Sequence, residues 1–247
     1  MQKTRKVAMI DSDATVHMGL VPMETPDRLV VLFSTQYRTW DKCAQNQIEL
    51  IKHICPNLDN CIVGVHYWND VDVPPPEPFL RLKNMKYSTS PNATQYTHYI
   101  LQWFERFQLS TRQALENAEE LYKLKYGEEM PLYQPILRLR PDFVVENIPN
   151  FPLPIKNGWI YYLSTWNTMH RPDPIPNKIE VVDLCLTTKF VLLQIINYDA
   201  RTAVVGHDHF IEIVFYSALK SMGINVLFDA NIKYGIMRDG WYYRLTV

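Results

Sequence analysis

The segment PILRLRPD, residues 135–142, has the pattern of a short buried strand that carries two arginines and ends in an aspartate. Because side chains alternate across a strand, Arg138, Arg140 and Asp142 are predicted to share one face, opposite Leu137 and Leu139. Arginine presents a planar fork that matches the oxygens of phosphate, so this face suits a polyanionic ligand. An internal ion-pair cluster that closes the edge of a sheet is the alternative interpretation.

On both sides of this segment, apolar runs of strand length alternate with runs of helical periodicity. Strands are predicted at 29–35, 61–68, 159–163 and 224–228, with a short one inside 79–87. Helices are predicted from Thr39 or Asp41 to Ile54, at 94–126 with Gly127 as the C-cap, at 182–196, and at 208–222. This order indicates an α/β fold with a mostly parallel central sheet flanked by helices. We expect a single domain over residues 1–247, of which 1–28 form an N-terminal extension.

Composition and charge narrow the class of protein. Of the 247 residues, 47% are hydrophobic, which suffices for a full core. The net charge of -1 does not favour a nucleic-acid partner. No apolar run has the length of a transmembrane helix. The four cysteines show no C-x-x-C spacing, which predicts reduced, buried thiols and a cytoplasmic protein.

Three of the predicted strands end in polar segments. They are STQYR at 34–38, HYWNDVD at 66–72, and RPD at 140–142. Ligands of parallel sheets bind beyond the carboxyl ends of the strands, so these three segments are expected to form one site.

The order of these segments resembles a family of glycosyltransferases from bacterial capsule and lipopolysaccharide gene clusters and from large DNA viruses. The shared pattern is a strand ending in S-x-Q-x-R, a helix bearing Asn46, a strand ending in Trp and Asp, a long helix, and then R-x-R-P-D. It covers residues 29–228, and R-x-R-P-D is its most specific part. The resemblance implies the nucleotide-diphospho-sugar transferase fold, called GT-A, and an enzyme that moves a sugar from a nucleotide-diphosphate-sugar to a glycan or another hydroxyl acceptor.

The resemblance also implies roles for individual residues on the side of the sugar donor. Ser34, Gln36 and Arg38 would contact the nucleotide of this donor substrate. Arg138 and Arg140 would lie near its diphosphate.

A divalent cation, Mn²⁺ or Mg²⁺, is a further expectation of the resemblance. Asp142 would occupy the place where GT-A enzymes keep the aspartate of their D-x-D metal motif, but Arg140 stands at the first acidic position of that motif. Because an arginine can neutralise a leaving diphosphate as a metal ion does, we expect weak or no metal binding at Asp142. His207 and His209 could join Asp142 as ligands, although paired histidines in a loop are more often solvated.

The catalytic base is expected on the late helix at 208–222. In the resembling family an acidic residue near the start of this helix serves the acceptor side, and Asp208 or Glu212 matches that place. The two residues are four apart and share a helix face. An inverting transfer needs one carboxylate to take the proton of the acceptor hydroxyl. The alternative interpretation of Asp208 is a plain helix N-cap.

Aromatic residues suggest where the acceptor binds. Trp166 and Asn167 follow a predicted strand, and sugars stack their apolar C–H face on aromatic rings. We therefore predict that Trp166 and Asn167 form a wall of the acceptor site.

Two other functions remain open. One is a non-catalytic nucleotide- or carbohydrate-binding protein on the same scaffold. The other is a haloacid-dehalogenase-like phosphatase, since Asp11 and Asp13 stand in a D-x-D-x-T segment of the kind whose first aspartate attacks phosphorus. That fold needs a helix after the motif, and Gly19, Pro22 and Pro26 argue against one.

Overall fold

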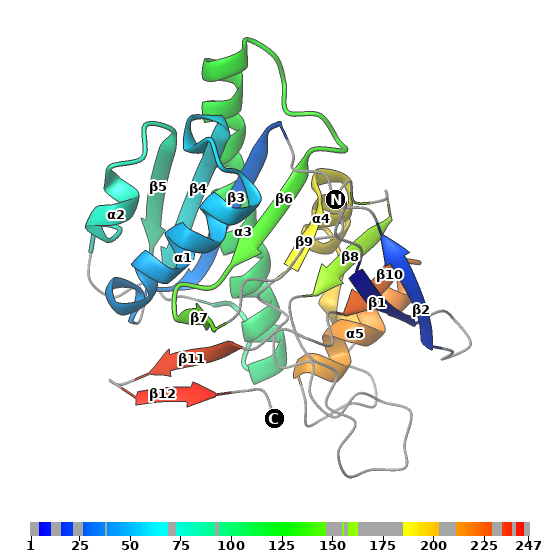
Figure 1. The fold of residues 1–247 in the computed structure, drawn as a ribbon. Helices are drawn as coiled ribbons and strands as arrows, with labels where there is room; N and C mark the ends of the chain where they lie inside the picture. The colour runs from blue at the N-terminus through cyan, green and yellow to red at the C-terminus, as the bar shows by residue number, and fades with distance from the viewer. Residues whose placement is uncertain are drawn as a thin grey trace.

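The computed structural model describes residues 5–10, 16–21, 27–37, 39–68, 73–91, 94–146, 155, 158–162, 185–202, 211–228, 234–238 and 241–244. Within these residues, helices cover both faces of a large sheet, and a small second sheet lies beyond one end of it (Figure 1). The fold is therefore α/β, as the alternation of apolar runs predicts.

The large sheet has nine strands in the order β2-β1-β10-β8-β9-β6-β3-β4-β5. Their bounds are β1 Arg5–Ile10, β2 Val16–Val21, β3 Leu29–Gln36, β4 Cys61–Trp68, β5 Met85–Ser90, β6 Pro135–Leu139, β8 Trp159–Tyr162, β9 Cys185–Thr188 and β10 Asn225–Phe228. The four strands β6, β3, β4 and β5 are mutually parallel. Strand β9 runs antiparallel to both β6 and β8, and β1 runs antiparallel to both β10 and β2. Since β8 and β10 are parallel, seven of the nine strands share one direction.

Five α-helices in the described residues pack against this sheet. Their bounds are α1 Trp40–Ile54, α2 Glu77–Leu80, α3 Tyr99–Tyr126, α4 Lys189–Ile196 and α5 Ile211–Ser221, and two 3₁₀ turns are η1 Leu58–Asn60 and η2 Ala200–Thr202. Side chains of α1 and α2 share one hydrophobic cluster with β3, β4 and β6. Side chains of α3, α4 and α5 belong to two clusters on the opposite face. The two-layer covering explains why β4 is buried along its whole length.

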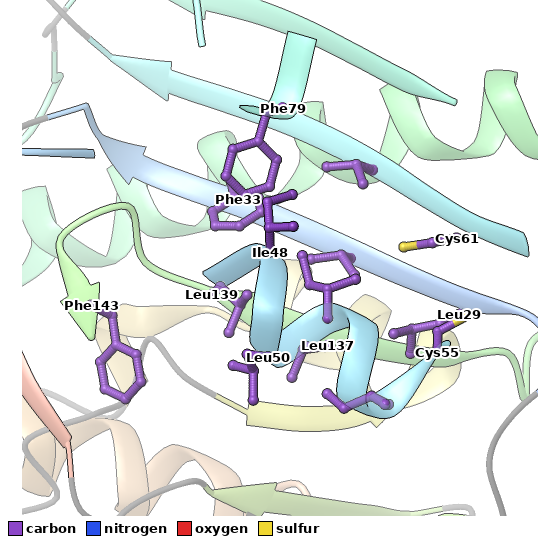
Figure 2. Close-up of a cluster of buried hydrophobic side chains, with 14 of the residues drawn as sticks. Leu29, Phe33, Ile48, Leu50, Cys55, Cys61, Phe79, Leu137, Leu139 and Phe143 are labelled. Carbon is purple, nitrogen blue, oxygen red and sulfur yellow. The ribbon is translucent and has the colours of Figure 1, made fainter. Parts of the chain in front are cut away.

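The core between α1 and the sheet combines aliphatic side chains with aromatic rings, among which those of Phe33 and Phe79 lie close together (Figure 2). Trp40 is fully buried, and its ring centre lies 4.8 Å from that of Phe33 and 5.0 Å from that of Phe79. The Trp40 indole donates a 2.8 Å hydrogen bond to Oε1 of Gln47, so the buried N–H of this ring is satisfied.

The α3 helix approaches β4 very closely at Gly64. A Cβ at this position would lie 2.1 Å from the carbonyl oxygen of Ala114 and 2.8 Å from Cβ of Ala118. The absence of a side chain at Gly64 therefore sets the distance between α3 and the sheet.

The small sheet has the order β12-β11-β7 and is antiparallel. It consists of β7 Phe143–Val145, β11 Tyr234–Arg238 and β12 Trp241–Arg244, none of which the sequence pattern predicted. The short turn at 140–142 joins β6 to β7, which places the small sheet at the carboxyl end of β6 (Figure 1).

The order of the strands reverses between β3 and β6. From β3 the chain passes through α1 to β4 and onward to β5, and α3 on the other face then returns it to β6 on the opposite side of β3. Such a reversal in a doubly wound sheet is a topological switch point, where the connections diverge and leave space for a ligand.

Most predicted elements are confirmed, but two helices begin later than predicted. The helix predicted at 94–126 begins at Tyr99. The interval 182–196 was predicted as a helix, but residues 185–188 form strand β9 and the helix begins at Lys189. Strand β9 lies between β6 and β8, and all four of its residues are buried. Its sequence therefore shows no alternation of apolar and polar residues that would distinguish a buried strand from a buried helix. The Thr188 side chain then accepts a hydrogen bond from the backbone of Val191 and caps α4.

The predicted N-terminal extension contributes two strands to the large sheet. Strands β1 and β2 form an antiparallel hairpin, and β1 pairs with β10. Asp11 and Asp13 lie outside the described residues, but residues 16–21 that follow them are a strand and not the helix that the phosphatase interpretation requires.

Candidate functional site

Five of the six predicted donor-binding residues are described, and these five lie at the switch point. Ser34 and Gln36 lie at the carboxyl end of β3, and Arg138 lies near the carboxyl end of the neighbouring β6, with Arg140 and Asp142 in the turn that follows. The register pairs Leu32 with Arg138, which brings the two strand ends side by side.

Arg138 is a fully buried cation on the α3 face of the sheet. Its Nε donates to the hydroxyl oxygens of Ser34 at 2.8 Å and of Thr111 at 3.2 Å, and these two hydroxyls are 3.1 Å apart. The guanidinium carbon lies 4.2 Å from the centre of the Phe107 ring, a cation–π geometry. Arg138 thus joins β6 to β3 and to α3, and its side chain has no exposed surface.

Arg140 is held differently. Its Nε and one terminal nitrogen donate to the two carboxylate oxygens of Asp142 at 2.7 and 2.9 Å. The Arg140 side chain is 10% exposed, whereas that of Asp142 is 1% exposed. A bidentate pair fixes the plane of the guanidinium, so Arg140 is oriented and partly accessible at the end of β6.

Asp142 is poorly suited to bind a metal ion in this arrangement. Both of its carboxylate oxygens accept hydrogen bonds from Arg140. In addition, the described part of the chain contains no group of three or more His, Cys, Asp or Glu side chains that could hold a metal ion.

The turn that carries Arg140 and Asp142 is anchored by two amide side chains of α1. Nε2 of Gln47 lies 3.0 Å from each of the carbonyl oxygens of Arg140, Pro141 and Phe143. Asn46 donates to the carbonyl of Val145 and accepts from its backbone N–H, both at 2.8 Å. The sequence pattern predicted no function for Gln47, although a glutamine among the buried apolar residues of α1 was the available signal.

The opposite side of the site is anchored by polar contacts between α3 and β4. Ser110 donates its hydroxyl hydrogen to the carbonyl of His66 at 2.9 Å, and its oxygen lies 3.0 Å from Nδ1 of His66. Because the hydroxyl hydrogen is used, Nδ1 must carry a proton and donate to Ser110. Burial lowers the pKa of His66 to about 4, so this imidazole is neutral at physiological pH.

Several predicted site residues stay predictions. Arg38, Trp166, Asn167 and Asp208 lie outside the described residues. So do His207 and His209, the histidines considered as metal ligands. Glu212 is the second residue of α5, but its side chain is not described.

No protein-family model matches the chain, and no curated protein is similar to it in sequence. In the part of the chain that the structure describes, no helix combines the length and the apolar character needed to cross a membrane. The function must therefore be inferred from the sheet topology and from the residues at the strand ends.

Proposed function

We propose that the protein is a glycosyltransferase that moves a sugar from a nucleotide-diphosphate-sugar to a glycan or another hydroxyl acceptor. The observation that carries this proposal is the location of the R-x-R-P-D segment at the switch point between β3 and β6. Ligands of open α/β sheets bind beyond the carboxyl ends of the strands at such a point. Gln36 and Arg140 there supply hydrogen-bonding and cationic groups that suit a phosphate-bearing ligand. Ser34, which was also predicted to contact the nucleotide, is fully buried, and its hydroxyl is bonded to Arg138 and Thr111.

The finer assignment to a GT-A-like domain is supported by the same region. The strands β6, β3, β4 and β5 are parallel, helices cover both of their faces, and a small sheet follows β6 directly. The described parts of the segments that carry the sequence resemblance lie on these strands, on the helices between them and in the turn after β6.

In this proposal the two arginines of the segment have separate roles. Arg138 is a positioning residue, because it is fully buried and holds Ser34 and Thr111 in place. Arg140 faces the diphosphate, and Asp142 orients its guanidinium. Since Asp142 does not fit a metal ligand here, no step of the reaction is routed through a metal ion.

The transfer itself needs one base. The acceptor hydroxyl loses its proton to a carboxylate, and its oxygen forms a bond to the anomeric carbon of the sugar. The bond from that carbon to the diphosphate breaks, and the leaving oxygen takes the electron pair. Arg140 stabilises the negative charge that develops on the diphosphate, and Asp208 is proposed as the base, with Glu212 as the second candidate.

Ligand binding tests the location of the donor site. A thermal-shift screen across nucleoside diphosphates and their sugar conjugates, with and without manganese, should find a stabilising ligand. Arg140→Ala and Gln36→Ala should then weaken its binding roughly ten- to a hundredfold, the effect of losing one hydrogen bond to a charged group. Arg28→Ala is the matched control: this arginine pairs with Glu128 and the Tyr122 hydroxyl just before the amino end of β3. If the Arg140 variant binds normally but melts far below the wild type, the arginine is only structural.

Asp208→Asn tests the base. Asparagine caps a helix about as well as aspartate, so the fold and donor binding should persist while turnover falls by roughly 10² to 10⁴. Transfer rates are compared at saturating donor and acceptor. Full activity of Asp208→Asn would exclude this residue, and Glu212→Gln would then decide whether a carboxylate of the late helix acts as the base.

A non-catalytic nucleotide- or carbohydrate-binding protein is the second candidate. A catalyst needs a free carboxylate as the base. At the described ends of β3, β4 and β6 the carboxylate is that of Asp142, and both of its oxygens are bonded to Arg140, which favours this second candidate. Incubation with the donor alone separates the two functions. An enzyme releases sugar slowly by hydrolysis, whereas a binding protein shows only the shift in melting temperature.

A further inference from the structure

Two buried N–H groups, one at the end of β4 and one on α3, have no acceptor in the described part of the chain. Nε1 of Trp68 and Nε of Arg106 are both buried, and neither donates a hydrogen bond to any group in the described part of the chain. Trp68 as a whole is only 9% exposed. Buried donors are nearly always paired in folded proteins, so two such groups near each other need an explanation.

The two residues lie at the same level of the interface between α3 and β4. The α3 helix runs opposite to the strands, because earlier residues of α3 contact later residues of the strands. On β5, Glu120 pairs with Lys86 and Asn117 with Ser88. On β4, Ser110 contacts His66. Trp68 is two residues beyond His66, a rise of about 6.6 Å along a strand. Arg106 is four residues before Ser110, a rise of about 6 Å along a helix. Both steps lead toward the carboxyl edge of the sheet.

Both side chains also face this interface. Residues alternate along β4, and Gly64 and His66 contact α3, so Trp68 lies on the α3 face as well. Arg106 stands one helical turn from Ser110 on the same side of α3, and helical side chains tilt toward the amino end, here toward the carboxyl edge. The register places Gln36 of β3 directly beside Trp68, so this edge is continuous with the candidate donor site.

The charge of Arg106 is not compensated within the described residues. Its sequence neighbour Glu105 accepts hydrogen bonds from the Thr94 hydroxyl and the backbone of Gln95, which turns that carboxylate toward its own loop. The other arginine of α3, Arg112, donates to the carbonyl of Ile196 and to the side chain of Asn197. Of the two arginines of α3, Arg106 is therefore the one that can bind a ligand.

We propose that Arg106 and Trp68 bind an anionic, phosphate-type group at the carboxyl edge of β4. An arginine and an indole only donate hydrogen bonds, so they select a ligand group that only accepts them, as phosphate oxygens do. The guanidinium group supplies the positive charge, and the indole N–H fixes the position of one phosphate oxygen. That this anion is the diphosphate of a sugar nucleotide rests on the function proposed above, whereas the anion site itself does not.

Titration with inorganic pyrophosphate and with uridine diphosphate tests the site. Binding is measured by calorimetry and by the ¹H–¹⁵N signals of the indole N–H groups, with Trp68→Phe identifying the signal of Trp68. Pyrophosphate should move this signal, because the N–H gains an acceptor. Arg106→Gln should weaken pyrophosphate binding roughly ten- to a hundredfold, and Trp68→Phe should weaken it less. Arg112→Gln, on the same helix, is the control that should bind as the wild type does.

The outcomes separate this site from the proposed reaction. Pyrophosphate binding that depends on Arg106, without any sugar release or transfer from nucleotide sugars, supports the anion site and contradicts the glycosyltransferase. Wild-type affinity in both Arg106→Gln and Trp68→Phe overturns the anion site, as does the absence of pyrophosphate binding to the wild-type protein at millimolar concentration. Melting curves of each variant verify its fold. If Arg106→Gln does not fold, an unmoved Trp68 indole signal in the wild-type titration still overturns the proposal.

Discussion

At the scale of single residues, two arginines that are two positions apart differ in what they can do. Arg138 is fully buried and donates to the hydroxyls of β3 and α3, whereas Arg140 pairs with Asp142 and keeps some exposure. A buried cation is stable only where enough acceptors surround it, so Arg138 contributes order to the strand ends. In the function proposed above, contact with the ligand falls to more accessible residues of the same edge, such as Arg140.

His66 should make the stability of the protein depend on pH. Its pKa is lowered to about 4 by burial, below the value of about 6.5 expected in the unfolded chain. Protons therefore bind the unfolded state first, and the free energy of unfolding should fall as the pH drops from about 6.5 to 4, by at most roughly 3 kcal/mol. His66→Asn keeps an N–H for Ser110 but cannot titrate, so its stability should fall less over this interval.

Urea denaturation at several pH values measures this effect. His53→Asn, at an exposed position of α1, is the control and should retain the pH dependence of the wild type. Equal slopes for the wild type and His66→Asn between pH 6.5 and 4 would contradict the assignment.

At the scale of elements, two helices hold the candidate site from opposite faces of the sheet. On one face α1 fixes the turn after β6 through Gln47 and Asn46. On the other face α3 contacts β4 through Ser110 and Asn117 and approaches it most closely at Gly64. The strand ends are thus positioned by side chains from rigid elements, which is what a preorganised site requires.

The close approach of α3 to β4 makes Gly64→Ala destabilising. The added Cβ would lie 2.1 Å from a backbone oxygen, so the helix must shift. We expect a loss of about 2–3 kcal/mol, or roughly 5–10 °C in melting temperature. Gly127→Ala makes the same chemical change at a helix end with φ of 71° and no atom within 4 Å of the new Cβ, so it should cost only about 1 kcal/mol of backbone strain. Equal losses in the two variants would show that the contact with Ala114 is not limiting.

At the scale of the whole molecule, the order of the strands brings together residues from distant parts of the chain. Ser34, Trp68, Arg106 and Arg140 come from four different elements or their ends, and all four lie at or near the carboxyl edge around the switch point. The same organisation buries the hydrophobic clusters on both faces, and with them all four cysteines.

The four thiols should report the integrity of the whole fold. Burial raises the pKa of Cys55 and Cys61 and raises the pKa of Cys43 to about 12, so little reactive thiolate is present. Native protein at pH 8 should react slowly with Ellman's reagent, and all four thiols should react at once in urea. A thiol of the native protein that reacts as fast as free cysteine would contradict the packing described for its cluster.

The sequence by itself determined the local features of this protein. Hydrophobic periodicity and helix caps are properties of neighbouring residues. They therefore predicted β3, β4, β6, α1 and the end of α3 at Gly127. The sequence also predicted that polar residues cluster at the strand ends. The tertiary structure decided which of those residues are buried and which partners they have. The bond from Arg138 to Ser34 joins residues 104 positions apart, and β9, buried on both sides, has no period to distinguish it from a helix. The relative level of Trp68 and Arg106 along the interface likewise depends on how closely α3 packs on β4, which no local pattern encodes.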